Sequence, residues 1–213
     1  MFDKKILDSI EVLFHSSIRI NADKVIYIDP FRVNEERHDA DLILLTHDHY
    51  DHFSPEDIDK VMNDGTVIAV PELMADKCRK IAGDRLMTVL PDNKYTICGI
   101  SVETVPAYNL LRPFHPRSKK WVGYVLTLGQ TRCYIAGDTD LTDESKCVSC
   151  DIALLPIGGT YTMNARKAAE LANTIRPHTV IPIHYGSIAG KPEDAETFKN
   201  AVQKDIEVKV LLK

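Results

Sequence analysis

Residues 46–52 read Thr46-His-Asp-His-Tyr-Asp-His52, and this stretch sets the expectations for the whole fold. Four residues of types that bind metals fall within six positions: His47, His49, Asp51 and His52. In extended backbone, alternate side chains point the same way, so His47 and His49 can reach one point in space. Asp51 and His52 lie where the chain turns into a predicted helix, so they can reach a second point nearby. Imidazole and carboxylate suit zinc and other first-row divalent ions, and we interpret the cluster as a metal site.

Two further apolar segments end in a polar residue of the same kind. Cys133-Tyr-Ile-Ala-Gly-Asp138 ends in an acid, and Val180-Ile-Pro-Ile-His184 ends in a histidine. The carboxyl edge of the strands is where α/β sheets assemble their sites, and Gly137 allows close approach of backbone and metal. For His184 alone, a hydrogen-bonded loop histidine is the more ordinary interpretation. Asp138 and His184 can join the His47 cluster only if their strands lie in one layer.

Hydrophobic periodicity predicts many short strands and four helices. The expected strands are Ile10–Leu13, Val25–Ile28, Leu42–Leu45, Thr66–Val70, Met87–Leu90, Ile100–Val105, Val122–Leu128, Arg132–Ala136, Ile152–Pro156, Val180–Ile183 and Ile206–Leu211. The expected helices are Pro55–Met62, with Ser54 as its N-cap, Glu72–Ile81, Ala165–Ile175 and Glu193–Gln203. This order predicts either two packed sheets with helices outside or one large mixed sheet.

Composition narrows the class of protein. The chain has 213 residues, 44% of them hydrophobic and 27% charged, so we expect one domain over residues 1–213. It lacks an apolar run of the ~20 residues that span a bilayer, and its first residues lack a secretory pattern, so we expect a cytoplasmic protein without membrane association. The net charge of -5 argues against a dedicated nucleic-acid binder. The five cysteines indicate no disulfide framework, and homo-oligomerisation stays open.

Three motifs together resemble those of the metallo-β-lactamase superfamily. They are Thr46–His52, Ala136-Gly-Asp-Thr139 and Ile183-His184-Tyr-Gly, and their order and spacing match from about Glu11 to Phe198. Asp29-Pro30 and the segment Leu155–Met163 resemble the branch that contains L-ascorbate-6-phosphate lactonase-like proteins. The resemblance implies an α/β (α+β) fold, a four-layer αββα sandwich with two divalent metal ions at one edge. Zinc is the first expectation, with manganese or iron as alternatives.

The resemblance also implies a ligand set for each ion. These ligands are His47 and His49 for the first ion, Asp51, His52 and His184 for the second, and Asp138 as a bridge between the two. Relatives usually supply one more histidine to the first ion, and this chain has Asn109 at that position. We interpret the nearby His115 as the replacement ligand or as a substrate contact. The alternatives are that His115 is a solvated loop residue and that the first ion lacks one ligand.

The implied chemistry is hydrolysis of a small-molecule ester, lactone or phosphoester by a hydroxide held between the two cations. Asp51 and Asp138 are the expected catalytic residues, with Asp51 orienting the hydroxide or taking its proton. Hydrogen-bond partners for the imidazoles are expected from Asp29, Thr46, Thr139 and, at most in this supporting role, His15.

The substrate is expected to be a small molecule, with an anion among the options. Its contacts are predicted to come from Tyr108, Asn109, Arg112 and Tyr185. The basic residues between Arg112 and Lys120 are compatible with an anion-binding lid and equally with a solvated charge run. Gly158-Gly-Thr-Tyr161 could present backbone N–H groups to substrate or form a tight turn.

Three other functions stay open at this point. One is a nuclease or phosphodiesterase of the same fold, although the acidic composition makes binding to nucleic acid an unfavoured expectation. Another is a di-iron redox protein, which normally requires a flavin-carrying partner domain. The last is a metal-binding protein without catalysis, which Asn109 in place of a ligand keeps open.

Overall fold

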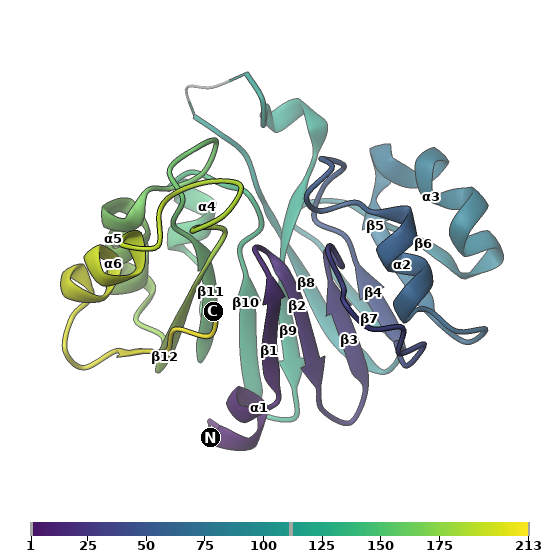
Figure 1. The fold of residues 1–213 in the computed structure, drawn as a ribbon, viewed down its shortest axis with the longest axis horizontal. Coiled ribbons are helices and arrows are strands. Elements are labelled where there is room, and N and C mark those ends of the chain that lie inside the picture. Colours follow the sequence, from purple (N-terminus) through teal and green to yellow (C-terminus); the bar gives the residue numbers. More distant parts are fainter. Residues whose placement is uncertain (1, 111–112, 213) are drawn as a thin grey trace.

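The computed structural model describes residues 2–110 and 113–212, and within them two β-sheets lie face to face (Figure 1). The first sheet has the order β1 (Ile10–Phe14), β2 (Ser17–Asn21), β3 (Val25–Ile28), β4 (Leu42–Leu44), β5 (Val67–Pro71) and β6 (Leu86–Val89). The second has the order β13 (Glu207–Val208), β12 (Thr179–Ile183), β11 (Ile152–Pro156), β10 (Thr131–Ile135), β9 (Val122–Leu128), β8 (Ile100–Pro106) and β7 (Lys94–Ile97). In each sheet the strands that come first in the chain pair antiparallel, β1 to β3 and β7 to β10. The later strands pair parallel, β3 to β6 and β10 to β13.

Helices cover the outer face of each sheet. The helices are α1 (Lys4–Asp8), α2 (Pro55–Val61), α3 (Ala75–Ala82), α4 (Asp143–Lys146), α5 (Ala165–Ile175) and α6 (Asp194–Ala201), with 3₁₀ turns at Glu72–Met74, Gly83–Arg85 and Arg117–Lys119. In Figure 1, α2 and α3 lie beside the first sheet, and α5 and α6 lie beside the second. The α2 helix starts where expected, because Ser54 accepts a hydrogen bond from the Asp57 N–H and Pro55 occupies the first turn.

Strand side chains alternate between the two apolar layers. In β4, Leu42 and Leu44 face the core between the sheets, whereas Ile43 packs under α2 and α3. In β11, Ile152 and Leu154 face that same central core, whereas the β11 residues between and after them pack toward α5. Because both faces of these strands are covered, every position is apolar, and the pattern is that of a four-layer αββα sandwich.

The predicted four-layer sandwich is therefore confirmed, and the alternative of one large mixed sheet is wrong. The strands β2 and β7 and the helices α1 and α4 were not predicted, since each has at most five residues and carries too little periodic signal. The last strand spans only Glu207–Val208, rather than the predicted range 206–211.

The loops that follow β4, β10 and β12 meet at one edge of the sandwich. The two sheets are joined there, because the Val122 N–H donates to the Thr46 carbonyl over 3.2 Å and the Tyr124 hydroxyl donates to the Leu45 carbonyl over 2.6 Å. Gly137 has a φ of +64°, and a Cβ there would lie 3.3 Å from the Thr46 side chain. The β4 and β10 loops can approach this closely because position 137 has no side chain.

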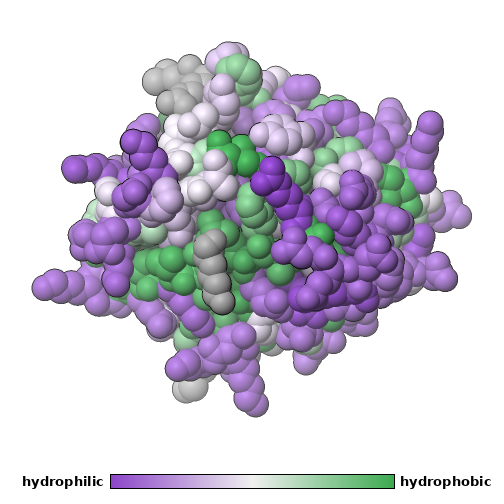
Figure 2. All heavy atoms as spheres, viewed as in Figure 1, coloured by the Kyte–Doolittle hydropathy of each residue, from purple (hydrophilic) through white to green (hydrophobic). Residues whose placement is uncertain are grey.

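Hydrophilic residues cover most of the face shown in Figure 2, and an apolar area lies near its centre. Within the described part of the chain, none of the helices combines the length and apolar character needed to cross a membrane.

Candidate metal centre

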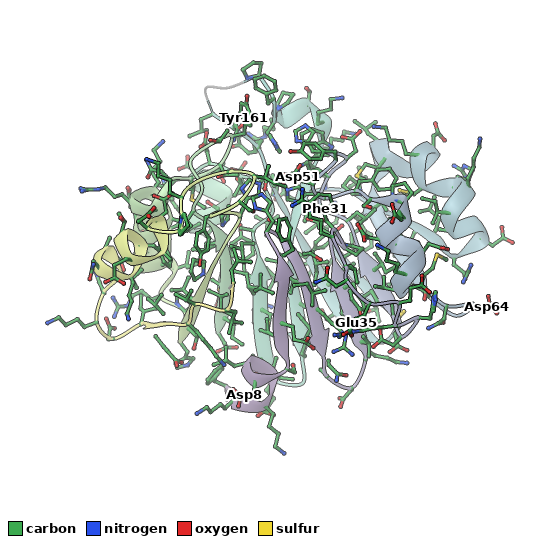
Figure 3. The ribbon with its side chains drawn as sticks, in the orientation of Figure 1. Asp8, Phe31, Glu35, Asp51, Asp64 and Tyr161 are labelled. Atoms are coloured by element: carbon green, nitrogen blue, oxygen red, sulfur yellow. The ribbon has the colours of Figure 1, made fainter. Side chains whose placement is uncertain are left out.

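The loop after β4 forms a tight turn that gathers the first ligands. The N–H groups of His52 and Phe53 both donate to the His49 carbonyl, over 3.0 and 2.8 Å. His47, Asp51 and His52 are buried, whereas His49 is half-buried. The turn thus places these side chains at the edge where the two sheets meet, as Figure 3 shows for Asp51.

A first cluster consists of three imidazoles. One ring nitrogen each of His47, His49 and His115 lies within 4.8 Å of the others. His115 reaches this cluster from the loop between β8 and β9, which is closed by a 2.7 Å hydrogen bond from the Asn109 N–H to the His115 carbonyl. His115 is 1% exposed, so it is not a solvated loop residue. The expected third nitrogen donor is present in space, although its binding of an ion stays a prediction.

A second cluster combines imidazoles and carboxylates. His184 Nε2 lies 3.1 Å from Asp138 Oδ2, and His52 Nε2 lies 3.3 Å from Asp138 Oδ1. Asp51 Oδ2 lies 3.6 Å from His184 Nε2. Asp138 Oδ2 is also 3.9 Å from His47 Nε2 and 3.7 Å from His115 Nε2, both in the first cluster. Asp138 therefore lies between the two clusters, as a bridging ligand must.

Several buried polar atoms in the clusters have no hydrogen-bond partner. Within the described residues these are Nδ1 of His115 and of His184 and a further five: Nε2 of His47, His52, His115 and His184, together with Oδ1 of Asp138. A buried polar atom without a partner costs about 1–3 kcal/mol, so a group of them in one place requires an explanation. Divalent cations would satisfy the four Nε2 atoms and Asp138 Oδ1, and the mixture of nitrogen and carboxylate donors suits first-row ions. The residues present therefore fit the implied metal centre.

Asp29 fixes the orientation of two of the imidazoles. Its Oδ2 accepts hydrogen bonds from His52 Nδ1 over 2.7 Å and from the Thr46 hydroxyl over 2.6 Å. Because the Thr46 hydroxyl gives its proton to Asp29, it accepts a hydrogen bond from His47 Nδ1 over 2.9 Å. Both rings therefore turn Nε2 toward the clusters. Asp29 and Thr46 support the imidazoles as expected, whereas the Thr139 hydroxyl donates instead to the backbone carbonyls of Tyr108 and Asp140.

The charges of the second cluster are strongly coupled. Burial opposes a charge on His52, but the Asp138 and Asp29 carboxylates outweigh it and raise the pKa of His52 well above its ordinary value. The same competition between burial and Asp138 raises the pKa of His184 to about 9. Burial would raise the pKa of Asp138, yet His184 and His52 hold that pKa well below its usual range. Without cations, protons on two imidazoles therefore balance the carboxylates.

The first cluster behaves differently. Burial lowers the pKa of His47 well below its ordinary value and lowers that of His115 to about 4. The pKa of His49 is also lowered, again chiefly by burial. These three imidazoles are neutral at pH 7, so their lone pairs are free to bind an ion.

His15 was expected at most to support the imidazoles, but its side chain lies directly beside the second cluster. It is fully buried in the turn between β1 and β2, and its Nε2 lies 3.6 Å from Asp51 Oδ2. Its carbonyl accepts the His184 N–H over 3.0 Å, and both residues have positive φ, 53° and 57°. Such backbone conformations cost about 1–3 kcal/mol and persist where the surrounding structure enforces them. The strained pair fixes His184 against the β1–β2 turn.

A cavity of about 480 Å³ opens above the two clusters. Its floor includes the candidate ligands His49, Asp51, His115, Asp138 and His184, and its walls include Tyr50, Phe114, Tyr161, Ile188 and Ala189. Of these wall residues, only Tyr161 belongs to a segment that was predicted as a possible substrate contact, Gly158–Tyr161. Phe114 was not predicted, although it precedes His115. Gly158 in that segment is a packing residue, since a Cβ there would lie 2.3 Å from the His184 carbonyl oxygen.

The structure does not bring two of the predicted substrate contacts to this cavity. The Tyr108 hydroxyl donates to Glu144 over 2.9 Å, and Tyr185 is buried beside a separate groove. Asn109 is buried and donates to the Tyr161 carbonyl over 2.8 Å, so it supports the cavity wall. Arg112 lies outside the described residues.

The basic segment is engaged elsewhere on the surface. Arg117 pairs with Glu144 over 2.6 Å, and Lys120 lies 3.5 Å from Glu72. The Lys119 ammonium lies 5.9 Å from the centre of the Trp121 ring. Among the described residues, this segment is a surface charge run rather than an anion-binding lid.

Comparison with known proteins supports the architecture and the metal centre. Residues 9–184 match the family model described as a beta-lactamase superfamily domain. A UPF0173 metal-dependent hydrolase of Thermococcus kodakarensis is 31% identical over 95% of each chain. A crystal structure from Parabacteroides distasonis, assigned as a metal-dependent hydrolase, has a TM-score of 0.82 at 31% identity and covers 96% of this chain and 93% of that one.

A metallo hydrolase of Ignicoccus hospitalis shares the fold with a TM-score of 0.76 at 23% identity, over 95% of this chain and 94% of that one. The narrower resemblance to lactonase-like proteins stays a prediction. The chain belongs to the beta-lactamase superfamily and, within it, to the UPF0173 metal-dependent hydrolases.

Proposed function

We propose that this protein binds two divalent cations, zinc foremost, and hydrolyses a small-molecule ester, lactone or phosphoester. The observation that carries the proposal is the position of Asp138 between two clusters. Nε2 of His47, His52, His115 and His184 there has no hydrogen-bond partner in the described part of the chain. His47, His49 and His115 would hold one ion, and Asp51, His52 and His184 the other, with Asp138 shared. Bound cations of this kind supply Lewis acidity and lower the pKa of water to near neutrality.

Asp51 is the residue best placed to orient the attacking water. It lines the floor of the cavity, and its Oδ2 lies 3.6 Å from both His15 Nε2 and His184 Nε2. Burial would raise the pKa of Asp51, but the adjacent His15 and His184 imidazoles lower it far below its usual range. The carboxylate therefore stays ionised at neutral pH and accepts a hydrogen bond from water, which fixes the direction of attack.

Small molecules fit the site better than nucleic acids do. The cavity has the volume of a small-molecule pocket, and the described basic residues beside it are paired with acids on the surface. A nucleic-acid substrate would require a basic track leading to the clusters. The open cavity above the clusters also favours catalysis over metal storage.

The test combines elemental analysis with a substrate panel. The purified protein is stripped with a chelator and reloaded separately with Zn²⁺, Mn²⁺ and Fe²⁺, and bound metal is counted per chain. Each form is then assayed with aryl esters, lactones and aryl phosphoesters. Two equivalents of metal and metal-dependent turnover of at least one class are expected. Full metal loading without turnover of any class would overturn the hydrolase assignment.

A further inference from the structure

We propose that the substrate is an ester or lactone whose remaining part is uncharged and apolar, a hydrocarbon chain or ring without a phosphate or free carboxylate group. This inference rests on the proposed hydrolase function. The reacting group would lie over the clusters, and the apolar body would lie against the aromatic wall of the cavity.

The first argument is the placement of exposed aromatic residues. The described residues include six large hydrophobic side chains that are exposed, and three of them line this cavity: Tyr50, Phe114 and Tyr161. Tyr50 is 68% exposed and Phe114 is 53% exposed. Exposed aromatic surface that gathers around one opening indicates a binding site for apolar groups.

The wall is assembled from four separate loops, which argues against a chance cluster. Tyr50 follows β4, Phe114 precedes β9, Tyr161 follows β11, and Ile188 with Ala189 follows β12. The Phe114 and Tyr161 rings pack with their centres 4.3 Å apart. Asn109 holds the Tyr161 backbone in place through its side-chain amide, so one face of the wall has a buried polar support.

The second argument is charge. Among the described residues that line the cavity there is no lysine or arginine, and the acid outside the clusters, Asp48, forms an ion pair with Lys77. Thr160 contributes one hydroxyl to the wall. An anionic group at the far end of a substrate would exchange its water for aromatic surface, and the described lining residues offer it no cation. This transfer is strongly unfavourable.

Two more aromatic rings lie beside Tyr50, beyond the residues that line the cavity. Phe31 contacts Tyr50 edge-on with ring centres 6.2 Å apart, and Phe14 lies 5.9 Å from Phe31. In the view of Figure 3, Asp51 lies between Tyr161 and Phe31. The Arg32 guanidinium lies over the two phenylalanine rings, 4.8 Å from the Phe14 centre and 5.5 Å from the Phe31 centre. The apolar surface therefore ends near Tyr50, and we expect the gain in reactivity per methylene to end where the chain leaves the cavity.

The test measures kcat/KM of the metal-loaded protein for a series of p-nitrophenyl esters, from acetate through butyrate and hexanoate to octanoate. Each added methylene that becomes buried should raise kcat/KM by about two- to fourfold. Mono-p-nitrophenyl adipate, which carries a terminal carboxylate, should react at least about tenfold more slowly than the hexanoate. Equal rates along the series, or a preference for the adipate, would overturn the proposal.

Matched variants locate the effect. Phe114→Ala and Tyr161→Ala should reduce the gain per methylene, whereas Leu73→Ala, which removes an exposed side chain outside the cavity, should leave the whole series unchanged. Arg112 lies outside the described part of the chain, and Arg112→Gln tests whether this residue binds an anionic group of the substrate. A preference for the adipate that disappears in this variant would show an anion subsite and contradict an apolar one.

A binding measurement separates this proposal from the hydrolase function. Trp121 is the sole tryptophan, and its ring centre lies 4.9 Å from those of His49 and His115. Octanamide, which carries an apolar chain, should change Trp121 fluorescence at concentrations at least about tenfold lower than suberamic acid, its carboxylate-bearing counterpart. Tighter binding of octanamide without any ester turnover would support the apolar cavity and contradict the hydrolase assignment. Tighter binding of suberamic acid would contradict the apolar cavity alone.

Discussion

The two ligand clusters share Asp138 but differ in charge. The first cluster, His47, His49 and His115, is made of imidazoles whose pKa values burial lowers, so it carries no proton at pH 7. In the second cluster, the carboxylates raise the pKa values of His52 and His184, so without cations it carries protons. An ion entering the first cluster meets free lone pairs, whereas an ion entering the second must displace protons.

The hydrogen bonds around the two clusters are alike in kind. Asp29 holds one ring in each, His52 directly and His47 through Thr46. His184 and His115 have no ring hydrogen-bond partner within residues 2–110 and 113–212, and each is held through a backbone bond, to His15 and from Asn109. The clusters therefore differ chiefly in charge: the first is the more easily loaded with an ion, and the two should respond differently to pH.

Removing the shared ligand should have the largest effect. In Asp138→Asn the carboxylate that lies between the clusters is neutral, so both ions should be lost or held weakly. Turnover should fall by at least about 10³-fold, since the charge that organises both ions is gone. Metal content and turnover of the loaded variant are the measurements. Asp143→Asn, at an exposed position in α4, is the control and should keep both. Two full equivalents of tightly bound metal in Asp138→Asn would refute the bridging role.

Changing pH should distinguish the clusters without mutation. The pKa of His184 is raised to about 9, so this imidazole is protonated below that pH and must release its proton to bind an ion. Affinity for the second ion should therefore rise by about tenfold per pH unit for each proton displaced, between pH 7 and 9. The first ion should show little dependence there, because the pKa of His115 is lowered to about 4. Calorimetric titration in two buffers with different ionisation enthalpies counts the protons, and equal release for both ions would contradict the comparison.

The sequence predicted the fold and the second cluster well because their signals are local. Strands such as Leu42–Leu44 and Ile152–Pro156 are apolar at every position, as expected for strands covered on both faces. Asp51 and His52 are adjacent in sequence, and Asp138 and His184 each follow a buried strand. Asp29 was proposed from the family resemblance, and the structure gives the physical reason: β3 and β4 are parallel neighbours with Ile28 paired to Leu44, which brings Asp29 beside Thr46.

Features that depend on loop closure carry no local signal. His115 was proposed from the resemblance, as a replacement for the ligand missing at Asn109, but no periodic pattern encodes the backbone bond from Asn109 that closes its loop. The basic segment was compatible with a lid, and only the folded chain shows Arg117 paired with Glu144, 27 positions away. The aromatic wall has the same origin, because Phe114 and Tyr161 meet across loops that are distant in sequence.

Truncating His115 should empty one cluster and spare the other. His115→Ala should lower the metal content from two equivalents to one and reduce turnover by roughly 10²-fold, since one nitrogen donor is lost and the remaining imidazoles cannot hold the ion tightly. His38→Ala, at an exposed loop position, is the matched control. Retention of both ions at unchanged affinity would show that His115 is not a ligand and would leave a substrate contact as its role.

The smallest predicted effect separates the two branches of the Asp29 network. Asp29→Asn weakens the hydrogen bonds that orient His52 directly and His47 through Thr46, so affinity for both ions should fall by about 10–100-fold. Thr46→Val removes the hydroxyl that accepts from His47 Nδ1 and donates to Asp29 Oδ2. His47 loses its partner whereas His52 keeps Asp29, so the first ion should be weakened more than the second, by roughly tenfold or less. Competition with a chromophoric chelator measures both affinities in each variant. If Thr46→Val weakened the second ion as much as the first, the two clusters would not be separately supported, because His47 and His52 would then respond as one unit through Asp29.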